Sequence, residues 1–152
     1  MSTSCEADVV AWANEQAECL HDGRFDLLDR EHLAEEIEHV GKSEQRELAN
    51  RMAVFCAHLL KWQYQSGRRG SRWESTVALQ RKEISWVLNE APSLASRLRD
   101  PMWVDRFWSN AVAQVISETG LDCFPEACPW SIEGEVLKEG WFPDAPKHAS
   151  DR

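Results

Sequence analysis

The stretch LANRMAVFCAHLLKW, residues 48–62, contains the strongest helical signal in this 152-residue chain. Its large apolar residues recur at spacings of four, three, four and three: Leu48, Met52, Phe55, Leu59 and Trp62. Because an α-helix advances by about 100° per residue, residues at these spacings lie along one face. The stretch therefore predicts a long helix over residues 44–65 whose apolar face packs in a core.

A shorter helix is predicted near the N-terminus, over residues 5–21, where apolar residues again lie near helical spacing. Ser4 is placed as its N-cap, since a serine hydroxyl can accept a hydrogen bond from a backbone N–H in the first turn. Gly23 lies just past the end, where glycine commonly terminates a helix.

A second helix is predicted over residues 30–40, with Asp29 placed as its cap. Gly41 follows, and since glycine weakens a helix, we expect the chain to stop or bend there and to restart at Ser43. The apolar side of this helix is predicted to consist of Leu33, Ile37 and Val40.

A third long helix is predicted to follow the loop QSGRRGSR, residues 65–72, which holds two glycines and three arginines. Ser71 followed by Glu74 is the pattern of a capping box, in which the two residues satisfy backbone donors at a helix start. This helix is expected to end near Asn89.

A fourth long helix is predicted over residues 101–118, because Pro101 suits a first helical turn and Gly120 suits a terminus. The segment that follows it is rich in proline and tryptophan, with one short helix expected at 131–138. We expect this segment to wrap over the end of a helical bundle.

The predicted fold is a single all-α domain over residues 1–152, a bundle of about four main helices with an irregular, proline-rich C-terminal wrap. The core is expected over about 5–120, the wrap over 121–146 and a terminal tail over 147–152. A chain of 152 residues is long enough to bury one such core without disulfides or a structural metal.

Charge and composition narrow the classes of function. The net charge of −9 argues against broad nucleic-acid binding and against anionic membranes, although residues 51–100, with nine bases and four acids, form a basic island. No apolar run is long enough to span a membrane, and the acidic N-terminus is unlike a signal peptide. Five cysteines are scattered along the chain. We therefore expect a cytoplasmic protein with reduced thiols.

Several short motifs resemble one known family. They are LAEEIE (33–38), GKSE (41–44), HLLKWQ (58–63), PSL (92–94), ETGL (118–121) and CPW (128–130). Together, and in this order, they resemble the bacterial domain-of-unknown-function family twenty-nine, whose members are small helical proteins. The resemblance implies a single all-helical domain and no established activity, so it assigns no catalytic residue.

A candidate metal site lies within HLAEEIEHVG, residues 32–41. On a helix, one stripe would contain His32, Glu35, Glu36 and His39. Imidazole and carboxylate groups at this spacing are typical of divalent-metal sites in helical bundles. Further ligands would have to come from His21 or from a second subunit, and the alternative interpretation is a solvated or interface stripe stabilised by Glu–His pairs.

A candidate anion site lies in the loop before the third helix, where Arg68, Arg69 and Arg72 are flanked by glycines. Guanidinium groups and the N–H groups at a helix start both favour phosphate. The alternative interpretation is a solvated loop, or arginines that pair with acidic residues of the same chain.

A candidate interface lies on the third helix, where Leu79 and Trp86 occupy the side opposite its other apolar residues. Eight tryptophans are many for this length, and large aromatic residues dominate interface energetics. The sequence therefore favours a non-catalytic interaction or regulatory module that forms a homo-oligomer or binds a protein partner. The alternative is a metal-dependent helical-bundle enzyme that uses the Glu/His stripe.

Overall fold

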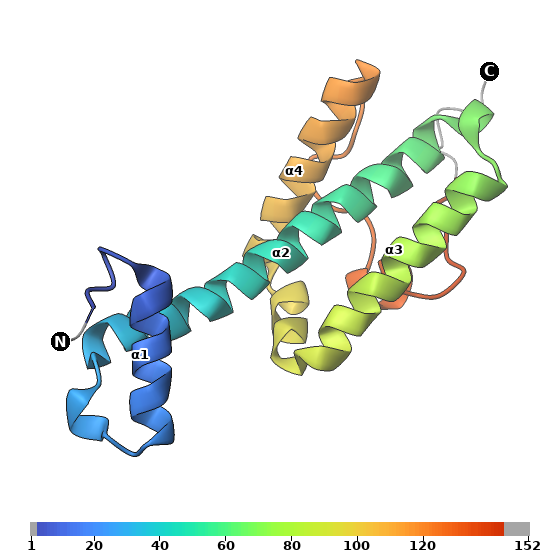
Figure 1. Ribbon diagram of the computed structural model, residues 1–152. Helices are drawn as coiled ribbons and strands as arrows, with labels where there is room; N and C mark the ends of the chain where they lie inside the picture. The colour runs from blue at the N-terminus through green and yellow to red at the C-terminus, as the bar shows by residue number, and fades with distance from the viewer. Residues whose placement is uncertain (1–2, 145–152) are drawn as a thin grey trace. The chain divides into compact units, whose positions relative to one another are not determined.

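The computed structural model describes residues 3–144, without the side chain of Arg68, and this part of the chain is helical with no strand. The all-α fold is therefore confirmed. The four main helices are α1 (Val9–His21), α2 (Arg30–Tyr64), α3 (Ser71–Glu90) and α4 (Pro101–Thr119) (Figure 1). None of the helices in the described range is long and apolar enough to cross a membrane.

The chain divides into two compact units, with the boundary after Glu44 inside α2. The N-terminal unit contains α1, a short 3-10 turn at Phe25–Leu27 and the start of α2. The C-terminal unit contains the remainder of α2, helices α3 and α4, and the segment that follows them. The expectation of one domain stays a prediction, as do the expected limits of its core.

Helix α1 begins at Val9, so the prediction that Ser4 caps it is wrong. The cap is Asp8, whose carboxylate accepts a hydrogen bond from the N–H of Ala11 at 3.1 Å. Ser4 instead belongs to a preceding turn, in which its carbonyl accepts hydrogen bonds from the N–H groups of Ala7 and Asp8. A carboxylate is favoured in this position because the positive end of the helix dipole lies there.

Helix α2 runs without a break from Arg30 to Tyr64, so the predicted stop at Gly41 and restart at Ser43 are wrong (Figure 1). Gly41 has a negative φ angle, as a helical residue requires. A glycine costs a helix about 1 kcal/mol relative to alanine, and this cost does not break a helix whose neighbouring residues are good helix formers.

The second half of α2 forms the core of the C-terminal unit, as its spacing predicts. Leu48, Met52, Phe55 and Leu59 are fully buried, and Trp62 is buried as well. Buried residues of α3, α4 and the C-terminal segment belong to the same hydrophobic cluster.

Helix α3 agrees with the predicted range, but the predicted cap at Ser71 is wrong. Gly70 occupies the cap position in an extended conformation and provides no side-chain hydrogen bond. Ser71 is already the first residue of the helix, and its carbonyl accepts a hydrogen bond from the hydroxyl of Ser75 at 2.9 Å. The first hydrogen bond of the helix runs from the N–H of Glu74 to the carbonyl of Gly70.

Helix α4 follows the long 3-10 segment Pro92–Arg99 and matches its prediction closely. Asp100 caps it by accepting a hydrogen bond from the N–H of Met102 at 3.0 Å. At the other end Gly120 has a φ angle of +76°, a left-handed conformation that favours glycine. Its buried residues are Phe107, Trp108, Ala111 and Val115, while Val104 is half-buried.

The C-terminal segment contributes directly to the core of the C-terminal unit. It forms one short π-helical turn, Ile132–Val136, and both of these end residues are buried. Trp130 packs edge-on against Trp108 and against Trp141, with ring centres 5.2 Å and 5.6 Å apart. The last residues of the predicted wrap, and the predicted tail 147–152, lie outside the described range. All five cysteines are free.

Candidate functional site

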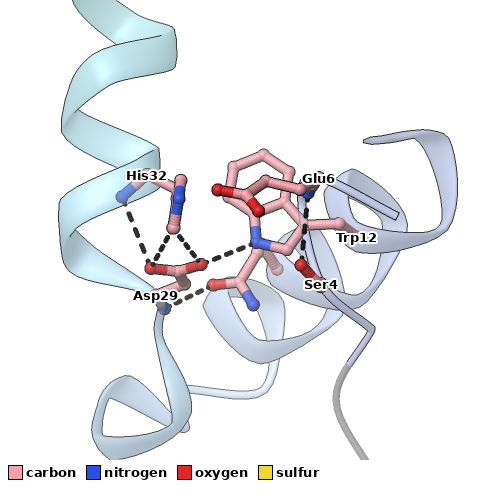
Figure 2. A network of polar contacts seen from close by, with 6 residues as sticks. Ser4, Glu6, Trp12, Asp29 and His32 are labelled. Carbon is pink, nitrogen blue, oxygen red and sulfur yellow. Dashed lines mark hydrogen bonds and ion pairs between the residues drawn. The ribbon is translucent and has the colours of Figure 1, made fainter. Parts of the chain in front are cut away.

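One carboxylate, that of Asp29, lies at the centre of a network of polar contacts in the N-terminal unit (Figure 2). The indole N–H of Trp12 donates to Oδ2 of Asp29 at 3.0 Å, and Nδ1 of His32 lies 2.8 Å from the same oxygen. The backbone N–H of Asp29 donates to the side-chain carbonyl of Gln16 at 2.7 Å. We call these four residues the Asp29 network.

The residues of the Asp29 network come from α1 and from the start of α2. Trp12 and Gln16 lie one turn apart on α1, and both are buried, with 3% of each exposed. Asp29 directly precedes α2 and accepts a hydrogen bond from the backbone N–H of His32 at 3.4 Å, the pattern of an N-cap. Asp29 therefore caps α2, as predicted, and also binds α1 to it.

The network favours the charged forms of both its titratable groups. Partial burial opposes ionisation of Asp29, but hydrogen bonds from His32 and Trp12 outweigh it and lower the pKa of the carboxyl below its usual value. The hydrogen bond to Asp29, together with its negative charge, raises the pKa of His32. The pair is therefore an imidazolium–carboxylate ion pair at mildly acidic pH.

Of the four residues in the predicted metal stripe, one is hydrogen-bonded within the chain and three are exposed. His32 is half-buried and hydrogen-bonded to Asp29, whereas Glu35, Glu36 and His39 are exposed on α2. Within residues 3–144, no group of three or more histidine, cysteine, aspartate or glutamate side chains is arranged to hold a metal ion. The metal site thus stays a prediction that needs ligands from a second molecule.

The neighbouring apolar side of α2 is open to solvent in this chain. Ile37 is 71% exposed and Val40 is 62% exposed, while Leu33 is half-buried. Helical spacing identified these residues as one face, but spacing alone cannot show that another element covers the face.

Two of the three arginines of the predicted anion site, Arg69 and Arg72, have side chains that the structure describes. Arg69 folds back on α2, where its Nε donates to the carbonyl of Trp62 at 2.8 Å and its guanidinium lies 5.1 Å from that indole ring. Arg72 instead lines a pocket of about 330 Å³ with His58 and Lys61. The side chain of Arg68 lies outside the described part of the structure. Anion binding stays a prediction, centred on Arg72.

The predicted interface residues on α3 are both exposed, Leu79 by 58% and Trp86 by 71%. Of the eight tryptophans, only Trp86 is classed as exposed. Leu79 also lines a pocket between α3 and the C-terminal segment. Their role as an interface stays a prediction.

Sequence reasoning missed the partners of Asp29. The spacing over residues 5–21 predicts a helix but does not identify Trp12 and Gln16 as partners of Asp29, although a glutamine at a buried helical position is itself a signal that a polar partner is needed. Arg81 was missed in the same way: it occupies the apolar register of α3 between Val77 and Ile84, and it is 5% exposed.

Comparison with known families agrees with the resemblance noted from the motifs. Residues 5–142 match the family described as Domain of unknown function DUF29. The match covers most of the chain, which therefore belongs to this family. Among curated proteins and among solved structures, nothing matches the chain.

Proposed function

We propose that this DUF29 protein is a non-catalytic protein-interaction module whose N-terminal unit carries the docking face. One observation carries the proposal: an apolar stripe on α1 has no partner within the described chain. It consists of Val9, Val10, Ala13, Ala17 and Leu20, all of them exposed. On a helix these positions fall within about 100° of one another, on the flank next to the face that carries Trp12 and Gln16.

The charge of the N-terminal unit indicates what kind of partner would bind there. Residues 1–44 contain 12 acids and 3 bases, so a partner surface that combines apolar and basic side chains is favoured. The basic island of a second copy has this character, which makes homo-association the first case to test.

The test is the mass of the native protein in solution by light scattering, compared with 17.4 kDa for one chain. We expect a larger species that Leu20→Glu converts to the monomer. Asn14→Glu is the matched control, because it adds the same charge at a polar, exposed position of α1 outside the stripe. A monomer that retrieves no protein on affinity purification, with or without Leu20→Glu, would contradict the proposal.

A metal-dependent helical-bundle enzyme is the second candidate. The observation in its favour is the hydrogen bond from Nδ1 of His32 to Asp29, because metal-binding histidines commonly donate their other ring nitrogen to a carboxylate. Glu35, Glu36 and His39 would have to be completed by a second copy. Elemental analysis of protein purified without chelator tests this candidate, and the absence of a stoichiometric divalent metal would remove it.

A further inference from the structure

Arg81 is a buried charge that forms no ion pair with a carboxylate of residues 3–144. Only 5% of the residue is exposed, and its Nε donates to the carbonyl of Val136 at 3.1 Å while Nη2 donates to the carbonyl of Trp141 at 2.6 Å. The guanidinium also lies over the rings of Phe55 and Phe142, at 5.4 Å and 6.0 Å from their centres. None of the described acidic residues forms an ion pair with it.

This arrangement leaves the charge of Arg81 incompletely compensated. Backbone carbonyls and aromatic faces are neutral, so they stabilise a cation less than a carboxylate does. Burial lowers the pKa of Arg81, while the negative charge of Glu139 acts in the opposite direction without forming an ion pair, and the guanidinium remains protonated at neutral pH. The third nitrogen of the group, Nη1, has no hydrogen-bond partner among the described residues.

A pocket of about 710 Å³ lies beside Arg81, between α3 and the C-terminal segment. Its apolar wall is formed by Ala78, Leu79, Leu137 and Phe142. The volume is in the range of pockets that bind small organic molecules, which usually combine apolar walls with a few fixed polar groups. Arg81 is such a group, because two hydrogen bonds hold it in place.

The other charges around the pocket define the ligand further. Lys82 adds a second positive charge, while Glu74 and Glu139 add two negative charges. The two carboxylates would repel a phosphate dianion more strongly than a singly charged group. A singly charged carboxylate could accept a hydrogen bond from Nη1 of Arg81 and be attracted by the positive charge of Lys82.

We propose that this pocket binds a monocarboxylate with an apolar tail, whose carboxylate pairs with Arg81 and whose tail lies against Leu79, Leu137 and Phe142. The inference does not depend on the proposed docking face, because every residue that it uses lies in the C-terminal unit. Such a ligand would also connect α3 to the C-terminal segment.

The test is isothermal titration of the full chain with decanoate and with decanamide, which has the same tail and no charge. We expect decanoate to bind at least about tenfold more tightly, because a hydrogen bond to a charged group contributes more than a neutral one. Equal binding of the two probes, or no binding of decanoate, would overturn the proposal.

Three variants locate the site. Arg81→Met should abolish the preference for decanoate, but it also removes two hydrogen bonds to the C-terminal segment. Ala78→Trp fills the pocket from an exposed position of α3 and leaves those bonds intact, so it should abolish binding in a protein with an unchanged circular dichroism spectrum. Glu139→Gln removes a repulsive charge and should strengthen binding several-fold, whereas Glu126→Gln, away from the pocket, should not. Unchanged binding in the Ala78→Trp protein would place decanoate elsewhere and overturn the proposal.

Discussion

The two units of this protein are each stabilised by a different kind of internal interaction. The C-terminal unit buries a continuous apolar cluster with members from α2, α3, α4 and the C-terminal segment. Within residues 3–44 of the N-terminal unit, only Trp12 and Gln16 are buried, and Asp29 joins α1 to α2 through its carboxylate and its backbone N–H. Apolar burial is additive over many side chains, whereas the Asp29 network depends on one group. The N-terminal unit should therefore be the part that opens first and that responds most to pH.

The largest effect is expected from a cavity in the C-terminal unit. Phe55→Ala removes a fully buried ring that packs in the core and faces Arg81, and it should lower the free energy of unfolding by about 3–5 kcal/mol. Val54→Ala is the neighbouring control, since Val54 is 36% exposed, and it should cost less than about 1 kcal/mol. Urea denaturation followed by circular dichroism measures both. Equal costs would contradict the assignment of the core.

The second effect concerns Asp29 and should be confined to the N-terminal unit. Asp29→Ala removes the acceptor of Trp12 and His32 together with the cap of α2. We expect several-fold faster hydrogen exchange of the α1 amides, while exchange of the buried amides around Phe55 stays unchanged. Asp26→Ala is the control, because Asp26 belongs to the turn before α2 and makes none of these contacts. Faster exchange in both units would mean that they open together.

The third effect is a pH dependence of the same contacts. The raised pKa of His32 stabilises the folded N-terminal unit fully below the unfolded histidine pKa of about 6.5, and this contribution is lost as the pH rises through the folded value. The lowered pKa of Asp29 contributes above about 3.9 and is lost as the pH falls through the folded value. Protection of the Trp12 indole N–H, measured by NMR after correction for intrinsic exchange, should therefore be greatest between about pH 4 and 6.5. In the His32→Gln protein, the protection of the Trp12 indole N–H should no longer decrease above about pH 6.5.

The smallest effect tests the helix that joins the two units. Gly41→Ala introduces a methyl group that meets no atom within 4 Å, in a helix that glycine weakens. It should stabilise α2 by up to about 1 kcal/mol, seen as slower hydrogen exchange on both sides of residue 41. Slower exchange on only one side would show that the helix opens separately in each unit.

Local signals in the sequence predicted most of the helices, but they did not predict several helix starts or the contacts between segments distant in the chain. The spacing of Leu48, Met52, Phe55 and Leu59 predicted a buried helix face, and Gly120 predicted the end of α4. The predictions at Ser4, Gly41 and Ser71 were wrong because each residue is compatible with a cap or a break without requiring one. At the start of α1, for example, Asp8 forms the cap in place of Ser4. The candidate sites were harder to predict, because Asp29 and Arg81 acquire their partners from segments distant in the chain.

The sequence by itself determined the all-α class, the spans of α3 and α4 and the residues of the central core, because hydrophobic spacing and terminal glycines act over a few residues. Only the tertiary structure decided that Asp29 binds Trp12 as well as capping α2, that Ile37 and the α1 stripe are exposed within the described residues, and that Arg81 is buried beside a pocket. These features depend on which helix lies against which. That choice is made by the total free energy of packing, and no short pattern of residues encodes it.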